Sequence, residues 1–271
     1  MEFINISAYK FVHLSEAEFP ILRRQLKEKA KMLQLKGTIL LSQEGINCFL
    51  CGLREKIDAY KSFLESYPMF VGMTFKESIS SHQPFSRMLV RLKKEIISMG
   101  HPEIEPEKKT APYISPETLK KWYDENKDML VLDTRNDYEV EIGTFEAAMD
   151  LNIETFRDFP NAVALLPDDI KKKPIVTFCT GGIRCEKAAQ YMLNQGFEEV
   201  YQLDGGILNY FEQCGGDHWQ GECFVFDKRV AVDPQLKETS TKQCYSCRSV
   251  LTLEMQNKPC PQCGGEGHLR T

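Results

Sequence analysis

Histidine is scarce in this 271-residue sequence, which has five, and no apolar run approaches the roughly 20 residues that a membrane-spanning helix needs. The few histidines give no convincing set of two histidines and one carboxylate for an iron site. A Gly-rich dinucleotide fingerprint is also missing, so we expect neither a flavin nor NAD. The first residues lack the basic and apolar regions of a signal peptide. We therefore expect a cytoplasmic protein that makes no membrane contact.

Cysteine, by contrast, is plentiful, with ten residues. Thiols stay reduced in the cytoplasm, so these cysteines are better interpreted as metal ligands or reactive groups than as disulfides. The 42% of apolar residues is enough to bury real cores, which excludes wholesale disorder. The length suggests two domains, with room for a small appendage.

The net charge of −5 averages two unlike parts of the chain. Residues 1–110 carry 17 basic and 13 acidic side chains, a balance of +4, whereas residues 111–271 carry 17 and 26, a balance of −9. Such asymmetry is a recognised pointer to a nucleic-acid or membrane contact. The alternative is that two domains simply have different solvated surfaces.

The first hundred residues alternate between strand and helix patterns. The expected elements are a strand at 3–12, a helix from Ser15 to Gly37, short strands at 38–42 and 47–51, a helix at 54–66 and a strand at 69–76. Ser15 and Glu18 have the spacing of a capping box. The order β-α-β-β-α-β predicts a ferredoxin-like, acylphosphatase-like α+β domain over residues 1–100.

A basic strand follows this domain pattern. Between Met88 and Ile96 the side chains alternate, which places Arg87, Arg91 and Lys93 on one face, with Lys94 close by. These four residues are the candidates for RNA binding, because phosphate contacts dominate nucleic-acid affinity. An ordinary solvated strand face is the alternative.

A second domain is expected beyond a linker at 100–116 that holds four prolines. Buried-type strands at 129–133, 174–178 and 200–203 alternate with helical segments, the first of them capped by Ser115. This alternation predicts an α/β domain with a parallel sheet over residues 112–214, with ligands at the carboxyl ends of its strands.

The loop after the middle strand carries the chemistry. Cys179 precedes a Gly-rich turn that opens a helix, where backbone amides and the helix N-terminus stabilise an anion. The predicted anion-binding residues are Thr180, Gly181, Gly182, Ile183, Arg184 and Cys185. A thiolate is favoured in such a place, so Cys179 is the candidate nucleophile. Cys185 is interpreted either as a packed side chain or as a resolving thiol.

Cysteine phosphatases need five residues between Cys and Arg, and Arg184 comes one position too early for them. The run Cys179-Thr-Gly-Gly-Ile-Arg instead resembles the six-residue loop of rhodanese domains, which carries a persulfide on its cysteine. Further similarities are Asp133-Thr134-Arg135 with Glu139 and Gly143, and Leu203-Asp-Gly-Gly206. This resemblance implies a rhodanese-like domain in which Asp133 and Arg135 support the loop. Two departures, Thr144 in place of a common His and Tyr210 in place of a frequent Trp, do not touch the nucleophile.

Two C-x-x-C pairs lie in the Cys-rich tail, residues 215–271. Their members are Cys244, Cys247, Cys260 and Cys263, with twelve residues between the pairs. Each pair can place two sulfurs on one ion, and two pairs complete a closed tetrahedral Zn²⁺ site of structural type. We therefore expect a zinc-ribbon-like segment. Cys48 and Cys51 share the spacing but lie in a predicted strand, where packing is the expected role.

Over most of its length the chain resembles one bacterial family. The segments that carry the resemblance are Gly37–Asn47, Val90–Ile96 and Cys179–Glu186. The family is that of the rhodanese-related, oxygen-dependent tRNA uridine hydroxylases, which form 5-hydroxyuridine at wobble position 34. The resemblance implies a tRNA-modifying oxidoreductase with Cys179 as its active-site cysteine, molecular oxygen as cosubstrate and the tRNA anticodon loop as partner.

The residues by themselves leave two other functions open. The first is a sulfurtransferase that carries a persulfide on Cys179, loaded from thiosulfate or another donor. The second is a non-enzymatic, zinc-stabilised adaptor for RNA or protein with a relict rhodanese domain. The intact Cys179 loop argues against the second, because a relict need not keep it.

Overall fold

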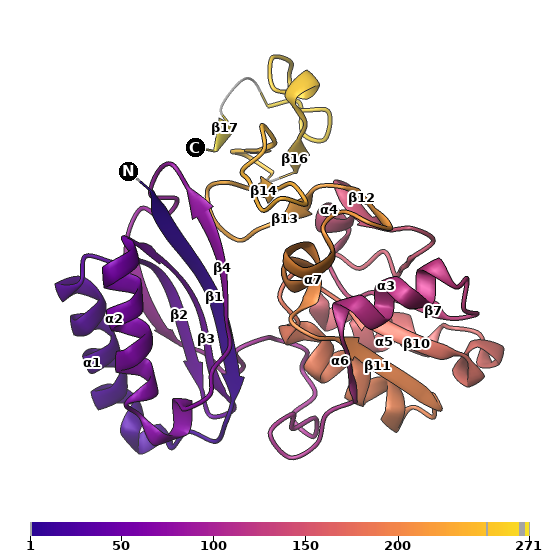
Figure 1. Cartoon of the computed structure of the whole chain (residues 1–271), viewed down its shortest axis with the longest axis horizontal. Coiled ribbons are helices and arrows are strands. Elements are labelled where there is room, and N and C mark those ends of the chain that lie inside the picture. Colours follow the sequence, from indigo (N-terminus) through magenta and orange to yellow (C-terminus); the bar gives the residue numbers. More distant parts are fainter. Residues whose placement is uncertain (1, 248, 266–268, 271) are drawn as a thin grey trace. The chain divides into compact units, whose positions relative to one another are not determined.

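The computed structural model describes residues 2–247, 249–265 and 269–270 (Figure 1). The chain forms two compact units, which divide between Thr110 and Ala111. None of the helices in these ranges combines the length and the apolar character needed to cross a bilayer.

Unit 1 is a five-stranded sheet in the order β4-β1-β3-β2-β5, with two helices over one face (Figure 1). Its strands are β1 (Phe3–Phe11), β2 (Lys36–Ser42), β3 (Gly45–Gly52), β4 (Phe75–Ser80) and β5 (Met88–Leu92), and its helices are α1 (Phe19–Met32) and α2 (Arg54–Glu65). The strand pairs are antiparallel except β2 with β5, which is parallel. The predicted β-α-β-β-α-β order and the ferredoxin-like, acylphosphatase-like fold are confirmed.

The core of unit 1 follows from the side-chain periods of about 2 residues in a strand and about 3.6 residues in a helix. Ile4, Ile6 and Ala8 alternate along β1, and Leu22 and Leu26 recur along α1, and all five are buried. The Tyr60 hydroxyl of α2 donates to the Leu26 carbonyl of α1, which ties the two helices together. Cys48 and Cys51 are fully buried in β3, as the packing interpretation predicts.

Two local predictions in unit 1 are wrong. The Ser15 side chain forms no capping hydrogen bond; it precedes a 3-10 turn, η1 (Glu16–Glu18), and the N-cap residue of α1 is Glu18. The strand predicted at 69–76 is instead a second 3-10 turn, η2 (Pro68–Phe70), and β4 begins only at Phe75. Pro68 has no amide to donate to a sheet ladder, and Phe70 is fully buried in the core.

Unit 2 contains a five-stranded, wholly parallel sheet in the order β6-β11-β10-β7-β9. Its strands are β6 (Tyr113–Ile114), β7 (Leu130–Asp133), β9 (Met149–Asp150), β10 (Pro174–Phe178) and β11 (Glu199–Leu203). The helices are α3 (Pro116–Asp124), α4 (Asp137–Val140), α5 (Phe159–Ala164), α6 (Ile183–Asn194) and α7 (Gly206–Cys214), with 3-10 turns η3 (Phe156–Asp158) and η4 (Asp168–Lys172). Ser115 caps α3 by accepting from the Thr118 amide, as predicted. The predicted parallel sheet is confirmed.

The first part of the tail joins the body of unit 2. Strand β12 (Trp219–Gly221) pairs with β8 (Gly143–Phe145), and β13 (Cys223–Phe224) pairs with β14 (Ala231–Val232) in a short hairpin. Trp219, Cys223 and Val232 pack in the same core as the sheet and α7. Residues 219–232 therefore belong by packing to the parallel-sheet body, although their composition groups them with the Cys-rich tail.

The last part of the tail is a small three-stranded sheet, β16-β15-β17. Its strands are β15 (Lys242–Cys244), β16 (Val250–Leu251) and β17 (Leu269–Arg270), with a 3-10 turn η5 (Leu253–Met255). The buried Val250 packs on Phe224 and Val230 of the β13–β14 hairpin. Thus this part of the tail is anchored to the rest of unit 2 by an apolar contact as well as by the chain.

Candidate active site and metal centre

Cys179 lies directly after β10, in a tight loop that ends at the first turn of α6. Gly182 adopts φ +93°, which an L side chain rarely tolerates, and its amide donates to the Cys179 sulfur at 3.1 Å. On the other side of the loop, the amides of Ile207 and Leu208 in α7 donate to the carbonyls of Cys179 and Thr180. The loop is therefore fixed from both sides, and an amide faces the sulfur.

Gly206 permits the close approach of α7 to this loop. Its φ is +65°, and a Cβ atom there would lie 2.3 Å from the Cys179 carbonyl oxygen and 2.7 Å from the Gly182 nitrogen. No side chain fits such distances. Glycine at the start of α7 is thus a requirement of the loop's geometry.

The electrostatics of the loop favour a thiolate. Burial of Cys179 by itself would raise its pKa, but a hydrogen bond from Cys185, the charge of Arg184 and the amides of Arg184 and Gly182 together lower the pKa to about 6. The Arg184 guanidinium is held by two hydrogen bonds to Glu139, at 2.6 and 2.8 Å. The loop therefore favours the ionised form of the Cys179 sulfur.

Cys185 lies beside Cys179 in the first turn of α6 and is fully buried. Burial, followed by its hydrogen bond to Cys179 and the charge on that sulfur, raises the pKa of Cys185 well above its usual value. Its thiol also lies 3.7 Å from the Thr134 hydroxyl. Cys185 is thus a neutral donor to the thiolate, packed as one interpretation predicts, and its resolving role stays a prediction.

Asp133 and Arg135 form a buried clamp below the loop. Arg135 donates to both carboxylate oxygens of Asp133, at 2.6–3.2 Å, and to the carbonyls of Glu139 and Gly143. Both side chains are fully buried. Thr144 donates to Asp133, so this departure from the rhodanese pattern supplies a partner of its own. The clamp fixes the segment that presents Glu139 and is closed to a substrate.

Two features of the site escape sequence reasoning. Glu139 follows Asp133 in the motif, but nothing in the spacing indicates that it pairs with Arg184, 45 positions later. The β13–β14 hairpin also meets the loop, because the Thr180 hydroxyl donates to the Phe224 carbonyl at 3.4 Å and Phe226 lies 5.9 Å from the Arg184 guanidinium carbon. Contacts between segments so distant in sequence leave no local signal.

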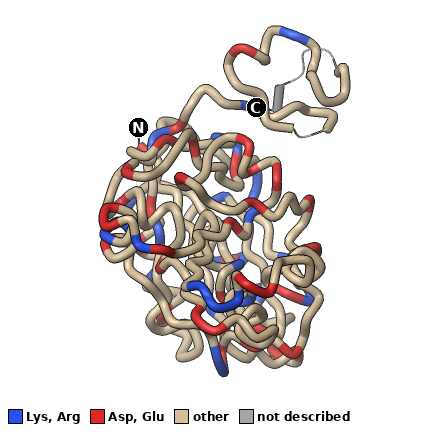
Figure 2. Tube along the Cα trace, turned by 90° about the vertical axis from the view of Figure 1, so that its right-hand side faces the viewer, with Lys and Arg blue, Asp and Glu red and all other residues tan. Residues whose placement is uncertain are grey.

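The four basic RNA-binding candidates lie on and around β5 of unit 1. Arg87, Arg91, Lys93 and Lys94 are all exposed, and none forms an ion pair within the described residues. The Glu44 carboxylate accepts from the Ile96 amide at 2.6 Å, and Asn47 donates to the Ile96 carbonyl. These contacts hold the segment that follows β5. The segments Gly37–Asn47 and Val90–Ile96, which are far apart in the sequence, therefore meet in the fold. Figure 2 shows charges of both signs along the trace.

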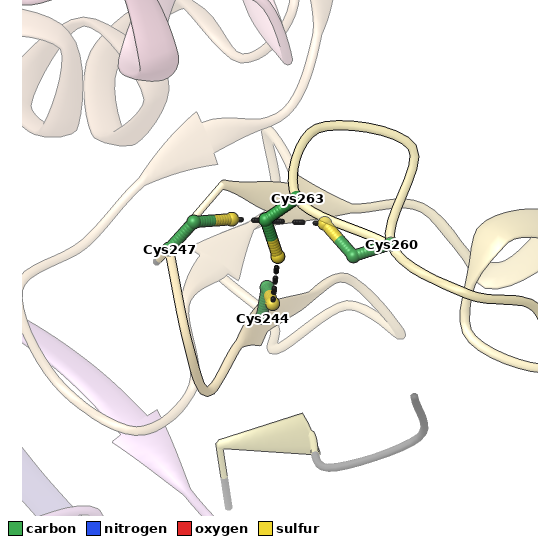
Figure 3. Close-up of side chains that lie close together, drawn as sticks. All are labelled: Cys244, Cys247, Cys260 and Cys263. Carbon is green, nitrogen blue, oxygen red and sulfur yellow. Dashed lines mark hydrogen bonds between the residues drawn. The ribbon is translucent and has the colours of Figure 1, made fainter. Parts of the chain in front are cut away.

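The four tail cysteines converge on one point (Figure 3). All four sulfurs lie within 4.8 Å of one another, with Cys244 at 3.7 Å from Cys263 and Cys247 at 3.6 Å from Cys260. Four thiolates at 2.3 Å from a tetrahedral Zn²⁺ would be about 3.8 Å apart. The cluster can therefore bind a metal ion, as the C-x-x-C spacing predicts.

Comparisons with known proteins give the same two domains and one family. Residues 3–96 match the UPF0176 acylphosphatase like domain, and residues 115–213 match the Rhodanese-like domain. Proteins called tRNA uridine(34) hydroxylase are 50% identical in Cupriavidus taiwanensis, over 98% of both chains, and 49% identical in Ralstonia nicotianae, over 97% of both. A third, in Paraburkholderia xenovorans, is 46% identical over 97% of this chain and 96% of its own. The chain thus belongs to the tRNA uridine(34) hydroxylase family.

Proposed function

We propose that this protein hydroxylates C5 of the wobble uridine, position 34, in the anticodon loop of tRNA, with molecular oxygen as cosubstrate. The observation that carries the proposal is the Cys179 sulfur, which accepts from the Gly182 amide in a loop that lowers its pKa, within a chain that matches a tRNA uridine(34) hydroxylase over 98% of its length. Because tRNA and reduced thiols are found in the cytoplasm, we place the activity there.

The chemistry proposed for Cys179 is addition to uracil. The sulfur forms a bond to C6 while the electron pair of the C5–C6 double bond moves toward O4, which makes C5 nucleophilic. One oxygen atom of O2 is then bound at C5, the C5 proton is lost and the sulfur leaves. The other oxygen atom leaves as water, with two electrons and two protons taken from an external pair of thiols that is oxidised to a disulfide. The loop amides stabilise the negative charge that develops on the pyrimidine.

Nucleoside mass spectrometry of tRNA from a deletion strain tests this function. We expect 5-hydroxyuridine and its derivatives to be lost and to return with the wild-type gene. Unchanged 5-hydroxyuridine would refute the proposal. Loss of a thiolated base, together with turnover of thiosulfate and cyanide by the purified protein, would establish the sulfurtransferase alternative instead. An unaltered nucleoside profile with RNA binding alone would point to the adaptor.

A persulfide-carrying function has one observation in its favour. The six-residue loop with a depressed Cys179 pKa suits a sulfur carrier as well as a nucleophile, since both act through the thiolate. The loop alone does not distinguish the two reactions, and the nucleoside profile of the tRNA is the measurement that does.

We propose three functional regions: residues 1–100 for RNA binding, 112–214 for catalysis and 215–271 for zinc binding. The +4 balance of the chain before residue 111 and the four exposed cations at β5 support the first assignment. Within the third region, residues 219–232 contribute to the catalytic body as well.

The basic residues at β5 are proposed to bind tRNA phosphates. A variant with Arg91, Lys93 and Lys94 changed to Gln is expected to bind tRNA more weakly. The slope of log affinity against log salt should fall by about 0.7–0.9 for each phosphate that the variant no longer neutralises. The control changes Arg24 and Lys31, exposed on α1, to Gln. Equal weakening in both variants would show that only general charge matters.

The tail cysteines are proposed to hold one structural Zn²⁺. Elemental analysis is expected to give about one zinc per chain, and Cys247→Ser should lower this content and expose residues 240–265 to protease. Cys214→Ser, at the end of α7, is the matched control and should keep its zinc. A zinc-free purified protein with a protease-resistant tail would contradict the assignment.

A further inference from the structure

A second cysteine, Cys185, lies beside the nucleophile at the end of the catalytic loop. Both cysteines are bonded to Gly182, whose amide donates to the Cys179 sulfur at 3.1 Å and whose carbonyl accepts from the Cys185 amide at 3.0 Å. The Cys185 thiol donates a hydrogen bond to the Cys179 sulfur, and both are free thiols. Two reduced sulfurs therefore face each other on one tightly held loop.

Hydrogen-bonding groups surround Cys185, although its side chain is fully buried. The Thr134 hydroxyl lies 3.7 Å from its sulfur, and the Thr177 hydroxyl also forms a hydrogen bond with it. Cys48 of unit 1 is buried to the same extent but lies in an apolar cluster. A thiol that only fills space gains nothing from three polar partners, so packing alone explains Cys185 poorly.

The two sulfurs share one negative charge. Burial, the hydrogen bond to Cys179 and the charge on that sulfur raise the pKa of Cys185 well above its usual value. When Cys179 forms its bond to C6 of uracil, its sulfur becomes a neutral thioether and this charge disappears. The buried Arg184 side chain keeps its positive charge beside the loop, so Cys185 then ionises more readily. The second thiol is thus activated only after the first has reacted.

We propose that Cys185 is a catalytic residue that accepts the second oxygen atom of O2. After Cys179 has added to C6 and O2 is bound at C5, the Cys185 proton passes to the outer oxygen atom and the Cys185 sulfur attacks that atom. The S–O bond forms and the O–O bond breaks, which leaves a sulfenic acid on Cys185 and an alkoxide on C5. The alkoxide takes up the proton that leaves C5, and the Cys179 thiolate departs from C6 as the C5–C6 double bond returns.

These steps end in a disulfide. The Cys179 thiolate attacks the sulfenic acid, so that the S–S bond forms, the S–O bond breaks and hydroxide leaves and becomes water with a proton from solvent. An external pair of thiols then reduces the Cys179–Cys185 disulfide by exchange and is itself oxidised to a disulfide. Cys185 in this way passes on the two electrons that the proposed hydroxylation requires, and the inference rests on that proposed function.

A single turnover without external thiols tests the inference. Reduced full-length protein is mixed in air with tRNA from the deletion strain, quenched with acid and alkylated. Peptide mass spectrometry should find one Cys179–Cys185 disulfide for each 5-hydroxyuridine formed, and none when oxygen or the tRNA is left out. Added dithiothreitol should remove the disulfide and raise the product above one 5-hydroxyuridine per chain, because each exchange restores both thiols.

Two variants separate the redox role of Cys185 from a role in folding. Cys185→Ser should form no such disulfide and should reduce the product by about tenfold or more. Its Cys179 thiolate should still titrate near the wild-type midpoint, because the serine hydroxyl can donate to the sulfur as the thiol does. Cys214→Ser, at the end of α7, should match the wild-type protein in both disulfide and product.

Three results would overturn the inference while hydroxylation itself stands. The first is wild-type product formed with both thiols still free, and the second is full product from Cys185→Ser. The third is a disulfide that forms equally without tRNA, since it would come from direct oxidation of the pair. If the wild-type protein forms no 5-hydroxyuridine even with dithiothreitol, the proposed function fails and this inference fails with it.

Discussion

Cys179→Ser is expected to reduce 5-hydroxyuridine formation by on the order of a thousandfold or more, because loss of an enzyme's nucleophile typically has an effect of that size or larger. A serine hydroxyl is not ionised at neutral pH, so neither the amides nor Arg184 can provide an anion for attack. The measurement is nucleoside mass spectrometry of tRNA from a deletion strain that carries the variant gene.

The control for this variant is Cys214→Ser, which changes a half-buried thiol at the end of α7. It should restore normal 5-hydroxyuridine. If Cys179→Ser does so as well, the thiolate mechanism is wrong, even when the reaction itself is confirmed.

The same thiolate sets a pH dependence. Its pKa of about 6 lies below the ordinary cysteine value, so the reactive anion is present above pH 6 and is lost as the pH falls through that value. Ultraviolet thiolate absorbance, taken as the difference between wild-type protein and Cys179→Ser, should titrate with this midpoint. A midpoint near the ordinary thiol value would mean that the loop does not stabilise the anion.

Glu139→Gln is expected to destabilise unit 2 by about 3–5 kcal/mol. The Glu139 carboxylate is fully buried, and its partner Arg184 is 4% exposed. Removal of one charge leaves the other buried and uncompensated, whereas the loss of an exposed pair would have little effect. Chemical denaturation, followed by a probe in unit 2, measures the change.

Glu141→Gln is the matched control, because Glu141 is exposed and lies two residues further along the same segment. Its free energy of unfolding should stay close to that of the wild-type protein. Should the two variants unfold alike, the buried pair would contribute no more than a surface charge does.

The sign of the pH effect on stability follows from the Glu139 pKa. Burial raises this pKa, but Arg184, through its charge and its hydrogen bonds, lowers it below the usual value overall. The pair's contribution is therefore complete above the pKa of an unfolded glutamate, about 4.3, and is lost as the pH falls toward the lower folded value. In Glu139→Gln this part of the acid transition should be absent.

The sequence predicts those parts of the site that are close together in the chain. Cys179 and the glycines after it predict an anion-binding loop, because strand, cysteine, turn and helix follow one another within a few residues. The metal site of the tail cysteines can be predicted in the same way, because two C-x-x-C pairs with the same type of ligand atom are enough to indicate it. The parallel sheet follows from buried-type strands that alternate with helices.

What the sequence does not predict depends on distant partners. Arg184 could be paired with Glu139 only through the fold, and Phe226 could be placed beside the loop only through the hairpin. The prediction of a strand at 69–76 is wrong because burial of Phe70 in a 3-10 turn outweighs the local strand propensity. Likewise, residues 219–232 resemble the Cys-rich tail in composition, so their packing in the core of unit 2 could not be predicted.

The bonds from α7 to the catalytic loop also give that loop a chemical polarity. The carbonyls of Cys179 and Thr180 accept from amides of α7, and the Gly182 carbonyl accepts from the Cys185 amide of α6, whereas the Gly182 amide faces the Cys179 sulfur. Such a surface favours groups that accept hydrogen bonds, such as phosphate oxygens or the two carbonyl oxygens of uracil. The exocyclic amine of cytosine can only donate and gains nothing there. This polarity predicts weaker binding when cytidine replaces uridine at position 34.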